Sequence, residues 1–415
     1  MTSLWRNREF NLLWTGQCLS ELGNAIASLA IPLLVLTVTG SPVQAGLVGT
    51  IAQVTRLVCR LPAGLLVDRV DRRRAMLACD LLQLAAFAGL GAAVLAGRVH
   101  LAVIIAVAVV DAAGGTLFGT AEHAALRSIV PIPRLPDAVA RNEARGYGVS
   151  LVGPAVGGLL FGLGAVWPFA ANAVSYLASM VGVSLIRRPL QQPREGAPGG
   201  LAEGLTFVFG NPFLRTVLFI AAPLNFAVTG TIFTIIIALQ GHGVAPAVIG
   251  LTETVIGAGG LIGAFAAPLL RRRLPMAVLT RAICWAATAC FVVSALLTTS
   301  VAAAVPVALT LLLAPACNAA LFGYQAAITP DRLQGRVVSV IFLVANSASA
   351  AAPLLAGLLV TAWSAGGAIL LFAAAVAGSA LVATFGRGLR DTPGLVSPAS
   401  AGAAPDRPAV STPPR

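Results

Sequence analysis

The sequence predicts an all-helical membrane protein with twelve transmembrane helices in two pseudo-symmetric six-helix bundles. Three observations predict this class: the composition, the number of long apolar segments and an internal repeat. Of the 415 residues, 58% are hydrophobic and 10% are charged, and the mean hydropathy is +0.90. A soluble domain carries about 25% charged residues. The composition therefore excludes a soluble multidomain enzyme and a disordered chain.

Twelve apolar segments are long enough to cross a bilayer as helices, because a hydrocarbon core of about 30 Å requires about 20 residues. They are longer than transmembrane strands and apolar on every side. Charged residues precede the first segment and no cleavage signal follows it, so we expect an uncleaved span. The segments lie at 13–37, 43–66, 75–97, 101–121, 143–164, 167–186, 213–238, 247–269, 276–298, 301–324, 336–361 and 365–385.

The arginines set the expected orientation in the membrane. All 27 basic residues are arginine, against 15 acidic residues. If the N-terminus is cytoplasmic, 24 arginines fall in cytoplasmic segments and only Arg98 falls in an outer loop, as the positive-inside rule requires. We therefore expect both termini in the cytoplasm. Membrane topology then explains the positive charge, and we expect no nucleic-acid partner.

An internal repeat supports the division into two halves. Gly64 matches Gly263, Pro154 matches Pro353 and the arginine run 72–74 matches the run 271–273, all at an offset of 199 residues. Parallel six-helix repeats are a known transporter architecture. We expect a bundle at 1–186, a cytoplasmic linker at 187–212, a second bundle at 213–386 and a disordered cytoplasmic tail at 387–415.

The segment that ends the second predicted span carries a glycine, an aspartate and several arginines: Gly64, Asp68, Arg69, Arg72 and Arg73. Glycine permits close helix approach, the aspartate can pair with a helix N-terminus, and the arginines can face anionic lipid or a carboxylate. This pattern resembles the loop 2–3 signature of the major facilitator superfamily, which implies that fold. In the second copy alanine replaces the aspartate, so we expect any conformational latch to be one-sided.

A second pattern lies in the fifth predicted span and consists of Gly153, Pro154, Gly157 and Gly158. It is similar to a motif of proton-antiport drug exporters in the same superfamily, although Val149 stands where that motif has a small residue. The alternative is generic helix packing. Residues 5–386 also resemble the bacterial branch that includes macrolide and enterobactin exporters. This resemblance implies a location in the bacterial cytoplasmic membrane.

Ionisable residues inside predicted spans indicate sites, because a charge there costs at least about 2.5–3.5 kcal/mol. Glu21 and Arg56 lie at similar depths on neighbouring spans, so we expect them to pair. Asp111 lies near the midplane. Desolvation disfavours a charged carboxylate and a nearby arginine favours it, so Glu21 or Asp111 is a candidate proton carrier with Arg56 beside it. The alternative is a static ion pair.

Two further acids have other expected roles. We expect Asp80 to be a structural partner of the basic loop, and Glu253 to lie at an outer gate. Four polar residues at mid-depth are candidates for a substrate cavity, because the resemblance places their spans against it, although each can equally be a helix–helix hydrogen-bond partner: Gln17, Asn24, Asn225 and Asn318.

The sequence predicts no cofactor or metal. The six cysteines form no CxxC pair and the three histidines are scattered, so we expect neither a zinc site nor a disulfide framework. There is no GxxxxGK[ST] loop for ATP. We therefore expect the energy to come from a proton gradient.

The resemblance implies a secondary transporter, not an enzyme. It would be a monomer in the lipid bilayer that exports small amphiphilic molecules, such as a drug, an antibiotic or a natural product, in exchange for protons by alternating access. The alternatives are a siderophore exporter or an importer of the same fold. An alternative of another class is a transport-inactive membrane scaffold or sensor.

Overall fold

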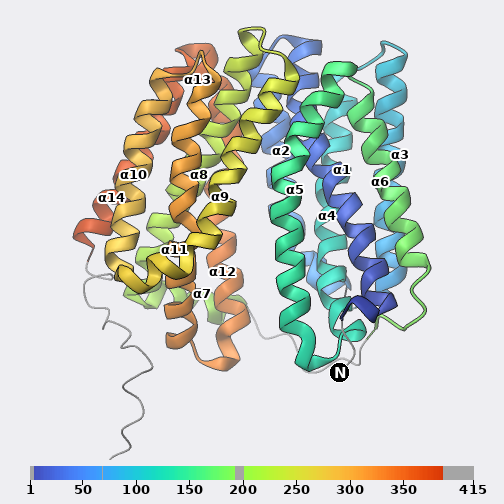
Figure 1. Ribbon diagram of the computed structural model, residues 1–415, viewed down its shortest axis with the longest axis horizontal. Helices are drawn as coiled ribbons and strands as arrows, with labels where there is room; N and C mark the ends of the chain where they lie inside the picture. Colours follow the sequence, from blue (N-terminus) through green and yellow to red (C-terminus); the bar gives the residue numbers. More distant parts are fainter. Residues whose placement is uncertain (1–3, 68, 192–200, 387–415) are drawn as a thin grey trace, which may run out of the picture.

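The computed structural model describes residues 4–67, 69–191 and 201–386 (Figure 1), and within these ranges no strand is assigned. Ten helices there are long and apolar enough to cross a membrane. The predicted segments 43–66 and 167–186 are also helical, but they are not among these ten. Twelve crossings therefore stay a prediction.

The first half of the chain forms six α-helices that pack together (Figure 1). Asn7 caps the first helix by accepting a hydrogen bond from the Phe10 amide at 3.2 Å, and Gly40 ends it in the left-handed conformation. The six helices are α1 (Arg8–Thr39), α2 (Pro42–Val67), α3 (Arg72–Leu95), α4 (Leu101–Ile129), α5 (Leu135–Leu163) and α6 (Trp167–Ser184).

The second half forms a matching group of helices. The predicted eleventh span is split into two α-helices joined by a short 3-10 helix, η5 (Ala348–Ala351). The elements are α8 (Pro212–Gly241), α9 (Pro246–Arg273), α10 (Met276–Leu296), α11 (Ala304–Ile328), α12 (Gln334–Ser347), α13 (Ala352–Ala362) and α14 (Ala365–Phe385). We call α1–α6 the N-terminal group and α8–α14 the C-terminal group.

Part of the predicted linker is helical. Helix α7 (Leu201–Gly210) lies within 187–212 and packs against α12 and α8. Its Glu203 forms ion pairs with Arg332 and Arg336. These contacts fix α7 to the C-terminal group. The predicted tail 387–415 lies outside the described residues.

Aromatic side chains occupy the interior of both groups. Phe87 packs against Phe169 and Tyr176, with ring centroids 6.4 and 5.9 Å apart, and Phe226 contacts Phe372 edge-on at 5.1 Å. Many large apolar residues elsewhere remain exposed. A soluble protein of this size would bury such residues, whereas a bilayer offers them an apolar solvent.

The two groups meet where glycines of one helix face proline carbonyls of another. At the α2–α13 crossing, a Cβ added to Gly46 would collide with the carbonyl oxygen of Pro353, and one added to Gly357 would collide with that of Pro42. Small residues at these positions let the backbones touch.

The α5–α9 crossing repeats this arrangement. A Cβ added to Gly158 would collide with the Pro246 carbonyl oxygen, and one added to Gly250 would collide with that of Pro154. Each helix of the two crossings thus presents a proline and, four residues later, a glycine. We call these two contacts the proline–glycine crossings. They lie at the end of the molecule away from the N-terminus (Figure 1).

The remaining glycines of the predicted motifs have different surroundings. Gly153 and Gly157 face Ala25 and Ile26 of α1, so they set the packing inside the N-terminal group. A Cβ added to Gly64 would meet no atom within 4 Å. The expectation that Gly64 permits a close helix contact is therefore wrong for this conformation.

Candidate functional site

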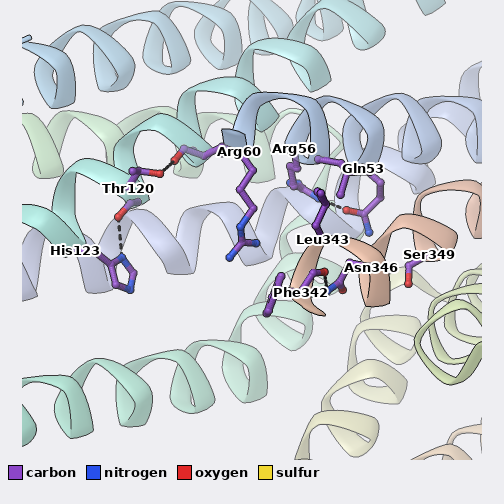
Figure 2. A pocket seen from close by; sticks show the side chains of 13 residues that line it. Gln53, Arg56, Arg60, Thr120, His123, Phe342, Leu343, Asn346 and Ser349 are labelled. Atoms are coloured by element: carbon purple, nitrogen blue, oxygen red, sulfur yellow. Dashed lines mark hydrogen bonds between the residues drawn. The ribbon is translucent and has the colours of Figure 1, made fainter. Parts of the chain in front are cut away.

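A pocket of about 510 Å³ lies between the N-terminal and C-terminal groups (Figure 2). Along α2 it begins just after the residues of the proline–glycine crossing, and along α12 and η5 it ends just before them. The α2–α13 crossing therefore bounds the pocket at one end. Its lining residues are Gln53, Arg56, Leu57, Arg60, Gly115, Thr116, Gly119, Thr120, His123, Phe342, Leu343, Asn346 and Ser349.

Arg60 links the two walls of this pocket. Its guanidinium carbon lies 4.0 Å from the centroid of the Phe342 ring, which belongs to α12. This is a cation–π contact between the groups, and it satisfies one face of the cation. Within the described ranges, Arg60 forms no ion pair.

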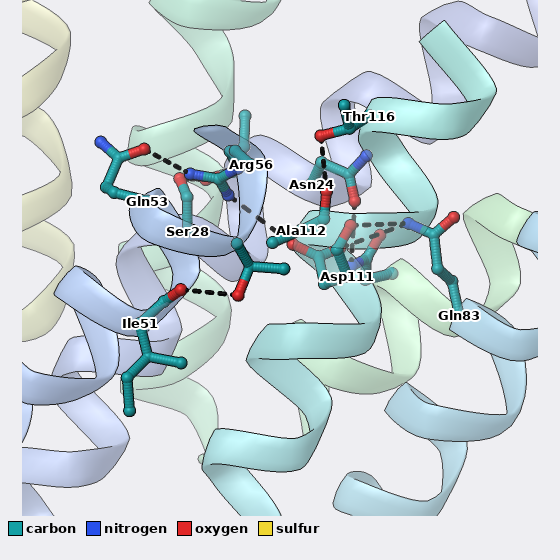
Figure 3. A network of polar contacts seen from close by, with 12 residues as sticks. Asn24, Ser28, Ile51, Gln53, Arg56, Gln83, Asp111, Ala112 and Thr116 are labelled. Atoms are coloured by element: carbon teal, nitrogen blue, oxygen red, sulfur yellow. Dashed lines mark hydrogen bonds and ion pairs between the residues drawn. The ribbon is translucent and has the colours of Figure 1, made fainter. Parts of the chain in front are cut away.

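Asp111 of α4 lies beside the pocket and receives several polar contacts (Figure 3). The Arg56 Nη2 atom is 3.8 Å from its Oδ2, and Gln53 accepts a 3.1 Å hydrogen bond from Arg56 Nη1. The Gln83 amide donates to Asp111 Oδ1 at 3.4 Å. Arg56 thus connects the pocket to a partly buried carboxylate.

Tyr176 of α6 extends the Asp111 network to α1. Its hydroxyl is 2.8 Å from Asp111 Oδ1 and also within hydrogen-bond distance of Asn24 Oδ1. The Gln83 amide donates to the same hydroxyl at 2.7 Å. A phenol has one hydrogen, so Tyr176 donates either to Asp111 or to Asn24. The Tyr176 hydroxyl therefore links Asp111 of α4 to Asn24 of α1.

A second charged cluster joins α1, α4 and α5. The Arg145 guanidinium donates to both oxygens of Glu21, from Nε at 2.9 Å and from Nη2 at 2.7 Å. Its Nη1 and Nη2 atoms also donate to Glu122 Oε1 at 3.1 Å. The side chains of Arg145 and Glu122 are 4% and 6% exposed, and that of Glu21 is 35% exposed. Two carboxylates thus share one cation.

This cluster corrects the sequence-based pairing. Glu21 pairs with Arg145 and Arg56 pairs with Asp111, so the expected Glu21–Arg56 pair is wrong. Arg145 was expected in the cytoplasmic positive charge, whereas it is buried within α5. Glu122 was missed because the predicted fourth span ends at 121, whereas α4 continues to Ile129.

Asp80 forms a third buried polar contact, and not with the basic loop. Ser179 of α6 donates to its Oδ2 at 2.7 Å, and Gln17 donates to the Ser179 hydroxyl at 3.0 Å. Asp80 and Gln17 are 1% and 4% exposed. The predicted role of Asp80 is therefore wrong, and Gln17 acts here as a helix–helix partner.

The other polar candidates are scattered. Asn24 belongs to the Tyr176 network, and Asn225 donates to the Ala345 carbonyl of α12 at 3.3 Å. Asn318 is exposed on α11 and Glu253 lies on α9 beside the contact with α5. None of these four lines the pocket.

The arginine motif holds the end of α3. Arg72 donates from Nη1 to the backbone carbonyls of Leu190, at 2.9 Å, and Ala124, at 3.3 Å. Arg69 is exposed, Arg73 is partly buried, and Asp68 lies outside the described residues. The observed partners of Arg72 are backbone carbonyls, whereas the sequence suggested lipid or a carboxylate. Within the described ranges, no group of three metal-ligating side chains is found.

The sequence is similar to that of known efflux proteins. A family described as transmembrane secretion effector matches residues 2–393. The multidrug efflux pump Tap of Mycolicibacterium fortuitum is 30% identical over 81% of this chain and 85% of its own length. Macrolide efflux protein A of Streptococcus pyogenes is 25% identical over 61% of this chain and 65% of its own length.

Solved structures share the fold. A bacterial homologue of the lysosomal transporter Spinster, in an inward-facing conformation, has a TM-score of 0.71 at 15% identity and covers 94% of this chain and 98% of its own. An inward-facing bacterial homologue of ferroportin has a TM-score of 0.72 at 17% identity, with 92% and 99% coverage. The chain therefore belongs to the transmembrane secretion effector family within the major facilitator superfamily, and it is a membrane transporter rather than an enzyme.

Proposed function

We propose that this protein exports small amphiphilic drugs or natural products in exchange for protons. The observation that carries the proposal is the pocket between the two groups, because Arg56 of its lining is paired with the partly buried carboxylate of Asp111. The names of the relatives Tap and macrolide efflux protein A support drug export. The pocket walls of arginine, threonine, leucine and phenylalanine suit a molecule that has both polar and apolar parts.

Alternating access follows from rocking of one group against the other about this pocket. We infer twelve spans in two bundles, 1–186 and 213–386, joined by 187–212, with both termini in the cytoplasm. The proline–glycine crossings then close the outer side, so the conformation is inward-facing. The better superposition on an inward-facing ferroportin homologue than on an outward-facing one, with TM-scores of 0.72 and 0.60, supports this state.

Two clusters can carry the proton. Asp111 accepts it when Arg56, 3.8 Å away, moves toward the pocket. Glu21 and Glu122 share Arg145, so a proton on one of them leaves the cation balanced by the other. Glu21 is the partly exposed member of that pair and offers the route to water. Both clusters lie on helices that rock together.

The test is uptake of a drug panel into everted vesicles, before and after the proton gradient is collapsed. We expect accumulation that stops with the uncoupler. Asp111→Asn, Glu21→Gln and Glu122→Gln should bind drug but lose gradient-driven uptake, while the exposed Asp137→Asn should behave as wild type. Uptake unaffected by the uncoupler would contradict proton exchange. Full coupled uptake by all three variants would contradict the proposed carriers.

The alternatives give different results in the same experiment. An importer would accumulate the compound in right-side-out vesicles. A scaffold or sensor would move nothing in either orientation. The monomer is tested separately, because drug binding by nanodiscs that each hold a single copy requires no partner subunit.

A further inference from the structure

The charge of the pocket identifies a substrate class. Among the residues that the structure describes, its lining contains two arginines, Arg56 and Arg60, one histidine and no acidic residue. Arg56 is balanced by Asp111, which lies behind the lining. Arg60 has no such partner within the described ranges. Among the described residues, Arg60 is therefore a cation of the pocket lining that has no ion-pair partner, and it is exposed to the pocket.

The way in which Arg60 is held leaves its hydrogen-bonding edge free. The Phe342 ring covers one face of the guanidinium, with 4.0 Å between Cζ and the ring centroid. Stacking uses the face of the cation, whereas its N–H donors point outward in the plane. A planar fork of this kind fits a carboxylate through two parallel hydrogen bonds.

The neighbouring groups add a histidine and an apolar wall. The Nδ1 atom of His123 lies 2.7 Å from the Gly119 carbonyl oxygen, which can only accept, so Nδ1 carries the hydrogen. In this tautomer the other ring nitrogen, Nε2, is an acceptor, so it can face a hydroxyl or amine group of a ligand rather than its carboxylate. Figure 2 places Arg60 and His123 on the same side of the pocket, with Phe342 and Leu343 opposite.

We propose that the pocket selects amphiphilic carboxylic acids. The carboxylate binds the N–H edge of Arg60, and the apolar body packs on Phe342 and Leu343. This inference rests on the proposed function, and it names the substrate class of that site. Because Arg60 belongs to α2 and Phe342 to α12, an acid bound there contacts both moving groups at once.

The experiment compares two fluorescent probes that differ only in charge, dansyl-leucine and dansyl-leucinamide. Binding is measured on the purified protein in phosphatidylcholine nanodiscs. We expect the wild type to bind the carboxylate about tenfold more tightly than the amide, as for one charge-assisted contact. Arg60→Gln should abolish this preference, Arg60→Lys should retain part of it, and Arg98→Gln, which removes a charge from an outer loop, should leave it unchanged.

Each other outcome overturns the inference. Equal binding of both probes by the wild type, binding of neither, or an unchanged preference in monodisperse Arg60→Gln would contradict it. If phosphatidylglycerol in the nanodisc displaces dansyl-leucine, the anion at Arg60 is a lipid headgroup and the substrate assignment is wrong. Vesicle uptake separates this inference from drug export. Export of amide and acid alike contradicts only the selectivity, whereas selective binding without any transport contradicts only the exporter.

Discussion

Arg145 holds Glu21 through two parallel hydrogen bonds, of 2.9 and 2.7 Å, while it also contacts the buried Glu122. One cation on α5 thereby fixes α1 and α4. Removing one partner of a buried ion pair is far more harmful than removing both, because a lone buried charge has no compensation.

We therefore expect Arg145→Gln to lower the free energy of unfolding by about 3 kcal/mol or more. Arg145→Lys should recover part of this loss, since an ammonium pairs with a carboxylate but lacks the fork. Thermal unfolding of the purified variants measures both effects. The Arg145→Gln/Glu122→Gln double variant should be more stable than Arg145→Gln alone. A single variant that unfolds at the wild-type temperature would refute a structural role for the cluster.

Gly158 at the α5–α9 crossing has no space for a side chain. We expect Gly158→Val to separate α5 from α9, because its Cβ would collide with the Pro246 carbonyl. The measurement is the distance between spin labels at the exposed positions Leu163 and Ala245, in a background without native cysteines. The matched control is Gly162→Val, on the same helix, where a Cβ meets nothing within 4 Å. Identical distance distributions for Gly158→Val and wild type would show that the crossing does not hold the helices.

Ser179 is the donor to the buried Asp80 carboxylate. The Ser179→Ala variant lacks the hydroxyl that donates to Asp80 in the wild type. Because the buried carboxylate then loses this hydrogen bond, we expect the free energy of unfolding to fall by about 1–3 kcal/mol. Ser184→Ala is the control, because Ser184 is exposed on the same helix. Equal stability of the two variants in a denaturation series would argue against an energetic role for this hydrogen bond.

The orientation of the chain can be tested with reporter fusions. The arginine distribution predicts that a fluorescent protein fused after residue 386 is fluorescent, whereas alkaline phosphatase at that site is inactive. Phosphatase inserted at Arg98 should be active. The reverse pattern would place the pocket opening on the outer side and would contradict export from the inward-facing state.

The sequence predicted most helices because a membrane span is set by length and apolarity, which are local properties. The proline–glycine crossings were found only in part, because Gly158 and Gly357 follow the 199-residue repeat whereas Gly46 and Gly250 are 204 residues apart. A search for repeats at the single offset of 199 residues therefore finds two of the four glycines of these crossings. Pairing across helices depends on depth and rotation together, which spacing alone does not give.

The charged residues illustrate the same limit. Glu21 and Asp111 were identified as candidates because each lies inside a predicted span. Arg145 lies near the start of the predicted fifth span and Glu122 just beyond the predicted fourth, where a charge usually faces water. Both are buried in the structure, and Glu122 lies in the part of α4 that continues beyond its predicted span. Helices longer than the bilayer requires are thus the feature that sequence reasoning did not use.

The proline–glycine crossings have a consequence for energy conservation. Protons move through chains of water molecules, and backbones that touch without side chains between them leave no room for such a chain. Because these contacts involve no charged group, the helices can also separate without exposing an unpaired charge to lipid. Under the proposed mechanism, a carrier closed in this way would cycle between its two states without dissipating the proton gradient proposed to drive it.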